Sequence, residues 1–589
     1  MSDNSDVTCM PVTTTGVSTR KDHRFLVDLY RQIEERFDVN AMCLEGVNIW
    51  PLVRLQLGRS FKEADQIDDA GMESASTSAL PSPNVDLQKI ASPQNKTERS
   101  VLIKRHAKYA KSNQKESRIR VERDFIKLEE AKGPKFVVQT KIEKYFLKKA
   151  DRLYAPILDP VAEDLGHFGK VQTLALEPLP FACVNDPLRI DLQAYLAVRT
   201  WKPVEISEEI NKALKEIEEF TKQAWPEYPL NRNLVYSRFN RLRQRRDYFY
   251  EVYRRLQPEF IVVSSFTGWL HALWAAKDLS IPVIDVQHGG QGPIHISTTH
   301  FTKPPEEGYH FLPDVLWLWG QTNYDFAAKW HPATGCHRHL PVIGGHRGVA
   351  RWDNDRKAGK LSVVDALFIE KFHGARNVLV TLSYAIDPLM PDTIFKAIQA
   401  TKDLYWLIRL HPIHRSDAAR DQIAARLTEM GCENYSIDEP TDVQMQTALY
   451  VSQAHLTPFS TSVREAVAFG VPSAICHPAG KLLFFEEIET GLLEYSEDTQ
   501  SIIDFVRRSL ASTEITSGLR RDAIETADAA LDDILTAAKE VKEQASPLRS
   551  NLPVPDELPT LEHEIKLQSR SSHSLGSLFN AIKKKVLRS

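Results

Sequence analysis

Three short segments hold residue types that could bind a phosphorylated ligand or move a proton. The first is Asp285-Val-Gln-His288-Gly289-Gly290, which follows an apolar run. Glycines let a ligand approach the backbone closely, and the histidine presents an imidazole to it. His288 could therefore take a proton from a reacting hydroxyl or donate a hydrogen bond to a phosphate. Asp285 is another candidate for the base, or a residue that orients its neighbours. The alternative for His288 is a loop histidine whose hydrogen bonds are satisfied within the protein.

The second segment is Ile408-Arg409-Leu410-His411-Pro412, at the end of another apolar run. Arg409 and His411 alternate with apolar residues, so their side chains share one side of a predicted strand. Pro412 discourages a helical conformation at His411, which predicts an abrupt exit from the sheet. A pair of this kind at a strand end suits a nucleotide phosphate or base.

The third segment, Pro458-Phe-Ser460-Thr461-Ser462-Val-Arg-Glu465, precedes a predicted short helix. Ser462 and Glu465 have the spacing of a capping box, which is a purely structural explanation for both. That leaves the hydroxyls of Ser460 and Thr461 beside a helix N-terminus, where backbone N–H groups favour an anion. We expect a phosphate of a bound nucleotide at this loop.

The elements that must position these segments alternate between strands and helices. Apolar runs rich in β-formers predict strands, and helical periodicity lies between them, with residues 142–165 also read as helix. The predicted strands are 135–140, 260–265, 282–287, 315–320, 377–383, 405–410 and 472–477, and a further strand is predicted just before residues 455–460. This pattern is typical of parallel βαβ units, and such sheets bind ligands beyond the carboxyl ends of their strands.

The fold class is therefore α/β, with two doubly wound Rossmann-like domains facing across a cleft and with helical and disordered extensions. The predicted divisions are a disordered N-terminus (1–20), an N-terminal domain (21–345) with an insertion at about 70–125, a C-terminal domain (346–510), a helix (511–546), and a linker with a basic amphipathic tail (547–589).

Composition places the chain among globular proteins and excludes several function classes. The 589 residues are 42% hydrophobic and 26% charged, and a formal net charge of −4 does not favour nucleic acid as a partner. The six scattered cysteines suit a reducing compartment, and we find neither a secretory signal nor about 18 consecutive apolar residues to span a bilayer. We expect a cytoplasmic protein. Residues 575–588 combine apolar spacing with lysines and could lie on the inner face of an anionic plasma membrane, or else fray or dock on the protein.

The order of these segments resembles a known family. QHG, then R-x-H-P, then S-T-S-x-x-E-A-x-x-x-G-x-P is similar to the GT-B-fold transferases of bacterial surface and capsular polysaccharides. These include polysialyltransferases, Kdo transferases and CDP-glycerol glycerophosphotransferases. The segment from Glu45-Gly46 to Trp50-Pro51 also resembles an N-terminal element of capsule-type sugar transferases.

The resemblance implies a glycosyltransferase that moves a sugar or a polyol phosphate from a nucleotide-activated donor, CMP- or CDP-linked, to a surface or capsular glycan. That acceptor could be a free or a lipid-linked glycan. Carried over to this sequence, His411, Ser460 and Thr461 would bind the donor nucleotide, and His288 would be a catalytic residue. The family's acidic base has its nearest counterpart in Glu45, for which an ordinary surface loop is the alternative. The resemblance implies no cofactor or metal, because hydroxyls, imidazole and a helix terminus can stabilise a leaving phosphate.

Two other functions remain open: a nucleotide-sugar epimerase of the same architecture, and a non-catalytic glycan-binding scaffold on a decayed transferase fold. Asp353-Asn-Asp355 has the D-x-D form of metal-dependent transferases but lies in a charged linker, so we expect solvated surface. The histidines and cysteine of the segment 331–339 lack the ligand spacing of zinc sites, which favours a polar loop near the cleft.

Overall fold

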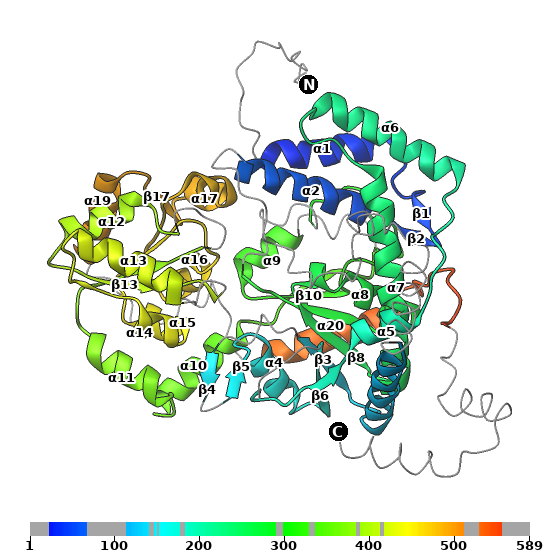
Figure 1. Cartoon of the computed structure of the whole chain (residues 1–589), viewed down its shortest axis with the longest axis horizontal. Helices are drawn as coiled ribbons and strands as arrows, with labels where there is room; N and C mark the ends of the chain where they lie inside the picture. The colour runs from blue at the N-terminus through cyan, green and yellow to red at the C-terminus, as the bar shows by residue number, and fades with distance from the viewer. Residues whose placement is uncertain are drawn as a thin grey trace, which may run out of the picture.

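The fold is described from a computed structural model of the chain (Figure 1). The structure describes residues 23–67, 114–140, 147–149, 152–176, 183–289, 299–328, 336–383, 389–412, 417–511 and 529–555. Gly290, the N-terminal segment predicted to be disordered (1–20) and the basic amphipathic tail lie outside these residues.

A seven-stranded sheet forms the centre of the N-terminal domain, and all its strand pairs among the described residues are parallel. In spatial order the strands are β11 (Leu340–Ile343), β10 (Val315–Leu318), β9 (Val283–Val286), β8 (Phe260–Ser264), β3 (Phe136–Thr140), β6 (Val171–Leu176) and β7 (Leu188–Ile190). Counted along the chain this is the order 3-2-1-4-5-6-7, the doubly wound arrangement, whose direction of winding reverses between β3 and β8.

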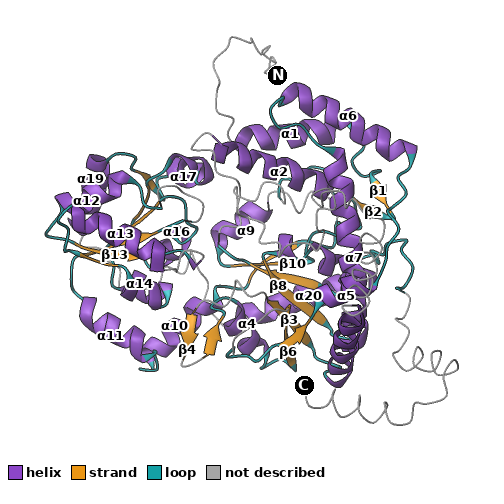
Figure 2. Cartoon of the chain, in the orientation of Figure 1, coloured by secondary structure: helices purple, strands orange, loops and turns teal. Residues whose placement is uncertain are grey.

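Helices cover both faces of this sheet, which is why its strands are apolar on both sides (Figure 2). One face packs on α4 (Leu158–Leu165) and α20 (Ala529–Gln544). The other packs on α1 (His23–Arg36), α2 (Trp50–Ile67), a helix over 114–130, α5 (Leu192–Val198), α6 (Glu208–Ala224), α7 (Arg232–Leu256) and α8 (Leu270–Asp278). The chain therefore crosses back from the C-terminal domain to complete the N-terminal core with α20.

A six-stranded parallel sheet forms the C-terminal domain. Its strands in spatial order are β14 (Tyr435–Ser436), β13 (Tyr405–Arg409), β12 (Asn377–Thr381), β15 (Ala454–Thr457), β16 (Ser473–Ile475) and β17 (Glu494–Tyr495). The order along the chain is 3-2-1-4-5-6, so the switch point lies between β12 and β15. The helices that pack on it are α11 (Val363–Phe372), α12 (Asp392–Ala400), α13 (Asp417–Glu429), α15 (Met445–Tyr450), α16 (Val463–Ala468) and α19 (Thr499–Ala511).

Helix α10 (Arg347–Lys357) joins the two domains. Arg347 Nε donates to Asp164 of α4 at 2.6 Å, and Arg351 pairs with Glu163, which ties α10 to the N-terminal domain. On its other side, Trp352 Nε1 donates to Thr447 Oγ1 of α15 at 2.8 Å. One helix therefore contacts both domains and fixes their junction.

The predicted fold class, two doubly wound Rossmann-like domains in a GT-B-like arrangement, is confirmed by these two sheets. The prediction of helix over 142–165 is wrong: β4 (Leu147–Lys149) and β5 (Arg152–Tyr154) form an antiparallel ribbon, and α4 begins only at Leu158. Pro156 explains the late start, because a proline disfavours helical geometry in the residue before it. The strands β6, β7, β11, β14 and β17 were missing from the prediction. Four of them have two to four residues and lie at the edges of their sheets, whereas β6 has six residues and lies between β3 and β7.

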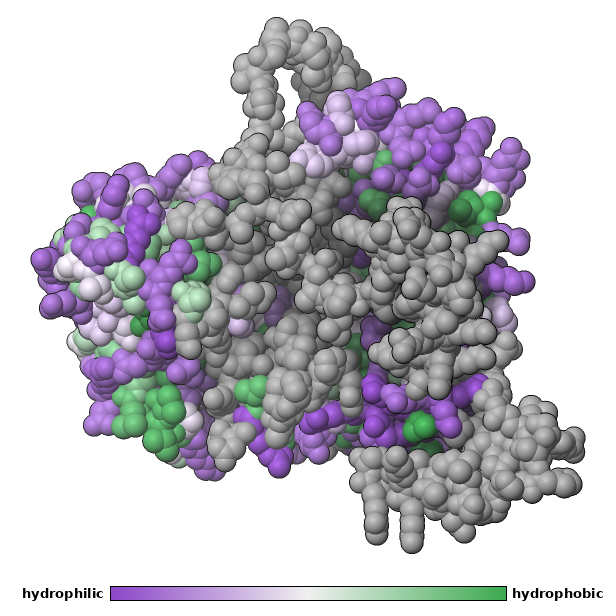
Figure 3. Space-filling model, in the orientation of Figure 1, coloured by the Kyte–Doolittle hydropathy of each residue, from purple (hydrophilic) through white to green (hydrophobic). Residues whose placement is uncertain are grey.

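Among the described residues visible in Figure 3, most are polar, and a green patch lies over α11 at the lower left. Val363, Val364 and Leu367 are the exposed apolar side chains of that helix. Within the described part of the chain, no helix has the length and apolarity that crossing a bilayer requires.

Candidate functional site

Hydroxyl side chains gather at the carboxyl ends of β12 and β15, the switch point of the C-terminal sheet. Thr457 Oγ1 donates to the carbonyl of Thr381 at 2.7 Å and accepts from the backbone N–H of Ser460 at 2.9 Å. Ser383 Oγ accepts from the N–H of Phe459 at 3.1 Å. These bonds hold the loop after β15 against the end of β12.

Ser460 and Ser462 continue this hydroxyl cluster toward a buried histidine. Ser462 Oγ lies 3.0 Å from Ser460 Oγ and 2.8 Å from Thr381 Oγ1, and Thr381 Oγ1 lies 2.8 Å from His455 Nε2. His455 is fully buried, and burial lowers the pKa of its imidazole to about 3, so the ring is neutral. Sequence reasoning missed His455, because a histidine inside a strand carries no signal of its own.

The capping box expected at Ser462 and Glu465 is not formed. The Ser462 side chain makes no capping hydrogen bond, since its hydroxyl belongs to the cluster around Thr381. Glu465 Oε1 instead accepts from Gln446 Nε2 at 3.1 Å and lies 3.5 Å from His346 Nε2, at the start of α10. Helix α16 has only six residues, so its dipole contributes little and the hydroxyls carry the anion-binding potential.

Arg409 and His411, predicted to share one side of a strand, take different positions because β13 ends at Arg409. Arg409 is buried, and its guanidinium donates to the carbonyls of Pro440 and Val443, the latter at 2.8 Å. It therefore holds the α14 segment (Asp438–Asp442) against the strand end. His411 and Pro412 lie half-buried just beyond β13.

His411 and the Ser460–Thr461 loop flank the end of β12. Strand β12 lies between β13 and β15 in the sheet, so their ends are about 10 Å apart at the usual spacing of parallel strands. The structure thus brings the two predicted segments to one edge, with the hydroxyls of β12 between them. At this separation the two segments do not touch each other directly, but both lie at the carboxyl edge of the sheet.

The Asp285–Gly289 segment ends β9 of the N-terminal sheet. Asp285 is fully buried and its carboxylate accepts from the N–H of Phe266 at 3.0 Å, so it orients the turn after β8. Gln287 Nε2 donates to the carbonyl of Gly289 at 2.7 Å, and its Oε1 accepts from the N–H of Trp319 at 2.8 Å. His288 is exposed.

The turn at Gly289 meets the Ser460–Thr461 loop of the other domain. Gly289 has φ +76°, and a Cβ built on it would lie 2.3 Å from Thr461 Oγ1 and 2.9 Å from Thr461 Cβ. A glycine is required here for both reasons, positive φ and close approach. The contact places the histidine-bearing turn of one sheet beside the hydroxyl loop of the other.

Glu45 does not join this group. It occupies the two-residue turn between β1 (Cys43–Leu44) and β2 (Val47–Asn48), with φ +50°, and its carbonyl accepts from the N–H of Asn551 at 2.7 Å. Figure 1 shows β1 and β2 at the right edge of the molecule, with the C-terminal domain at the left. The hairpin is a packed structural element of the N-terminal domain.

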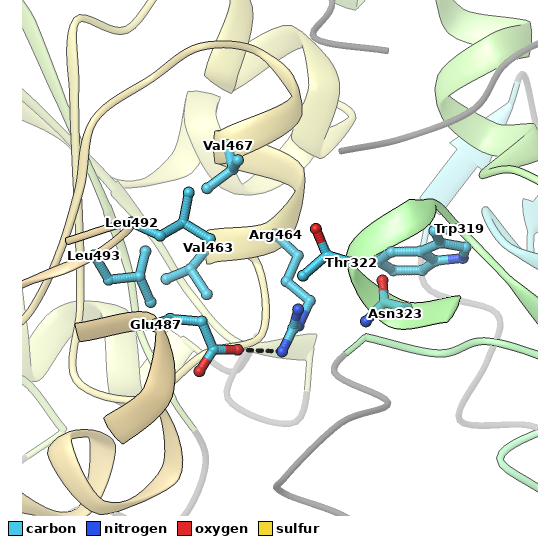
Figure 4. Close-up of a pocket in the computed structure, with 9 residues that line it drawn as sticks. All are labelled: Trp319, Thr322, Asn323, Val463, Arg464, Val467, Glu487, Leu492 and Leu493. Carbon is cyan, nitrogen blue, oxygen red and sulfur yellow. Dashed lines mark hydrogen bonds and ion pairs between the residues drawn. The ribbon is translucent and has the colours of Figure 1, made fainter. Parts of the chain in front are cut away.

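A small pocket of about 30 Å³ lies between the domains, beside the first turn of α16 (Figure 4). Trp319, Thr322 and Asn323, at and before α9 (Gln321–Ala328), form one wall. The other wall comes from the C-terminal domain, where Arg464 of α16 pairs with Glu487 of α18 (Phe485–Glu489). No sequence pattern marked Arg464 or Glu487, because they are 23 residues apart and meet only in the fold.

The D-x-D pattern at Asp353 and the segment 331–339, neither of which was predicted to bind a metal, contain residues with structural roles. Asp353 lies on α10 rather than in a linker, and it pairs with Arg356 at 3.0 Å and Lys357 at 2.5 Å, which hold the pKa of its carboxyl below the usual range. His339 is buried rather than part of a polar loop: its Nδ1 lies 2.6 Å from the carbonyl of Pro313, and its Nε2 accepts from the N–H of Tyr309. Among the described residues, no three His, Cys, Asp or Glu side chains are grouped as metal ligands would be.

No protein-family model and no curated protein sequence matches the chain. Among solved structures, it is similar to the co-structure of MnaA from S. aureus with UDP (14% identity, TM-score 0.41, covering 69% of this chain and 95% of that one). It is also similar to UDP-GlcNAc 2-epimerase from Neisseria meningitidis bound to UDP-GlcNAc (13%, 0.40, 69% and 99%) and to MurG from Acinetobacter baumannii (11%, 0.35, 74% and 100%). The strand order of the two sheets defines the fold of this chain.

Proposed function

We propose that the protein is a glycosyltransferase that moves a sugar or a polyol phosphate from a nucleotide-activated donor to a glycan acceptor. The observation that carries the proposal is the contact between Gly289 and Thr461. It joins an exposed imidazole on one sheet to a cluster of hydroxyls at the switch point of the other. Acid–base chemistry and the binding of a leaving phosphate need such groups side by side.

In this proposal the C-terminal domain holds the donor. Ser460 and Thr461 would donate hydrogen bonds to its phosphate, and His411 would contact the donor from the other side of β12. Arg409 would act indirectly by holding the strand end, and Glu465 would help to set the domain junction through His346.

The N-terminal domain would bind the acceptor and supply the base. His288 is our candidate for the base, because it is exposed beside Gly289, whereas Asp285 is fully buried under the turn. Glu45 lies on the β1–β2 hairpin and has no part in this scheme. The family resemblance favours a cytidine nucleotide and a surface or capsular glycan, formed at the cytoplasmic face of the plasma membrane.

A donor screen tests the proposal. The full chain is incubated with CMP-, CDP-, UDP- and GDP-activated sugars and polyols, with and without a library of acceptor glycans, and products are read by mass spectrometry. We expect a product whose formation depends on the acceptor. Conversion of the donor to an epimer without any acceptor would favour the epimerase instead, and calorimetry that finds no nucleotide bound would favour the scaffold.

A further inference from the structure

The hydroxyls around Ser460 form a continuous chain that ends in the buried interior at His455. Five side chains take part, at successive separations of 3.0, 2.8, 2.8 and 3.0 Å. From the interior outward they are Ser473, His455, Thr381, Ser462 and Ser460. Each hydroxyl in such a chain has one hydrogen to give, so the direction of one bond determines the direction of all the others.

The outer end of the chain defines this direction. In the geometry of the Ser462–Ser460 contact, Ser462 Oγ is the donor and Ser460 Oγ the acceptor. Ser460 Oγ also accepts from the backbone N–H of Ser462 at 3.3 Å. Both acceptor positions of the Ser460 oxygen are therefore used, and its own hydrogen is left for a group outside the chain.

The same direction follows through the interior. Since Ser462 gives its hydrogen to Ser460, the 2.8 Å contact between Ser462 and Thr381 requires Thr381 to donate. Thr381 must then accept from His455 Nε2, which lies 2.8 Å away. Ser462 Oγ lies 3.4 Å from the same nitrogen, and because its hydrogen goes to Ser460 it can only accept there, which again requires a hydrogen on Nε2. The other ring nitrogen, Nδ1, accepts in turn from Ser473 Oγ at 3.0 Å. The competing contact of Ser473 Oγ with the carbonyl of Val471 is longer, at 3.3 Å.

We propose that His455, held as the Nε2–H tautomer, polarises this chain so that Ser460 is a hydrogen-bond donor toward the cleft. The ligand group that Ser460 meets must then be an acceptor, as phosphate oxygens are, and a sugar hydroxyl could bind only through its oxygen. His455, Thr381 and Ser462 are positioning residues, since all three are buried behind Ser460 and act only through it. The inference rests on the proposed function only in naming the ligand a nucleotide phosphate.

The environment of His455 keeps the chain in one state. The ring is buried, and burial holds the pKa of the imidazole near 3, so it stays neutral. A protonated ring would donate from both nitrogens and would remove the acceptor that Ser473 needs. A single tautomer at neutral pH therefore keeps the Ser460 hydroxyl in donating form before any ligand arrives, which is the preorganisation that oxyanion binding requires.

The first experiment reads the tautomer directly. The full chain labelled with ¹⁵N-histidine gives ring nitrogen shifts that separate the two neutral tautomers, and the His455 signal is identified by its loss in His455→Gln. We expect Nε2 protonated and Nδ1 unprotonated. The reverse assignment, or a charged ring at pH 7, would overturn the proposal whatever the protein binds.

The second experiment measures the binding of CDP, CMP, UDP and GDP by calorimetry. Thr381→Val removes the relay hydroxyl at nearly constant volume, and Thr381→Ser restores it. Thr401→Val is the matched control: this buried threonine likewise uses its hydroxyl as donor and acceptor, donating to the carbonyl of Ala397 and accepting from Trp406, but it follows α12 at the other end of β13. Loss of an aligned donor to a charged phosphate should weaken binding roughly 10-fold in Thr381→Val, with near wild-type affinity in Thr381→Ser and Thr401→Val.

A double substitution separates a relay from a general structural effect. In the Ser460→Ala background, Thr381→Val should have no further effect on nucleotide affinity, because Ser460 is the end that the chain serves. If Thr381→Val lowers nucleotide affinity equally in the wild type and in the Ser460→Ala background, the relay is overturned. If Ser460→Ala itself leaves nucleotide binding intact, the proposed donor site fails instead, and the tautomer measurement still decides the direction of the chain.

Discussion

The Cα of Gly289 packs directly against the side chain of Thr461, across the junction of the two domains. Gly289 follows β9, and Thr461 lies in the loop after β15, so the segments that follow strands of two different sheets touch at this point. The contact exists only because Gly289 has no side chain. Five predictions test this junction, the proposed site and the buried histidines.

Gly289→Ala should prevent the contact, because the new Cβ would lie 2.3 Å from Thr461 Oγ1. We expect glycosyl transfer to fall strongly while nucleotide binding to the C-terminal domain persists. Gly374→Ala is the matched control: Gly374 has a similar φ of +80° but no atom within 4 Å of the added Cβ. Both variants bear the strain of positive φ, roughly 1 kcal/mol, so equal losses of activity in the two would refute a specific role for the contact.

His288→Ala should lower the turnover number of transfer by about 10²-fold or more, as expected for loss of a general base. Its affinity for nucleotide should stay unchanged, because His288 belongs to the other domain. His337→Ala, which replaces another exposed histidine of the N-terminal domain, serves as control. Steady-state kinetics that find the two variants alike would remove His288 from the mechanism.

His411→Ala should weaken nucleotide binding about 10-fold, the usual cost of one hydrogen bond to a charged group. The exposed His373 precedes the opposite end of β12 and gives the control variant His373→Ala. Calorimetry measures the affinity, and thermal unfolding checks that both variants fold. An unchanged affinity in His411→Ala would contradict its position in the donor site.

The stability of the protein should fall as pH is lowered from 6.5 toward 5. Burial lowers the pKa of His310, His339 and His455 to about 3, from an ordinary value of 6.5. In this window the unfolded chain binds protons that the folded protein does not. Each of these histidines therefore lowers the free energy of unfolding by up to about 1.4 kcal/mol for each pH unit. Carboxylates remain largely ionised above about pH 5, so the effect belongs to the histidines. Denaturant unfolding should show a shallower pH dependence in His455→Gln, and an unchanged slope would mean that His455 titrates normally.

Transfer should continue in the presence of EDTA, since we propose hydroxyls and imidazole as the groups that stabilise the leaving phosphate. The assay uses protein dialysed against the chelator, followed by addition of Mg²⁺ or Mn²⁺. Activity that disappears on dialysis and returns with either ion would establish a metal-dependent reaction in place of the one proposed.

The sequence alone determined the α/β class, the two-domain division and most central strands, because strands buried on both faces must be apolar along their whole length. It also marked the strand ends at His288, His411 and Ser460, where chain direction and residue type are local properties. Helix periodicity misled over residues 142–165, since local patterns do not distinguish a short ribbon with a following helix from one long helix.

Only the tertiary structure decided which of these ends meet. The winding order of the strands places β12 between His411 and Ser460, and the domain junction places Gly289 on Thr461. It also places Glu45 on a distant hairpin. The Ser462 hydroxyl, predicted to cap a helix, is instead part of a hydroxyl chain that reaches His455. Such contacts join residues tens to hundreds of positions apart, and they depend on backbone paths and side-chain directions that no local stretch of sequence encodes.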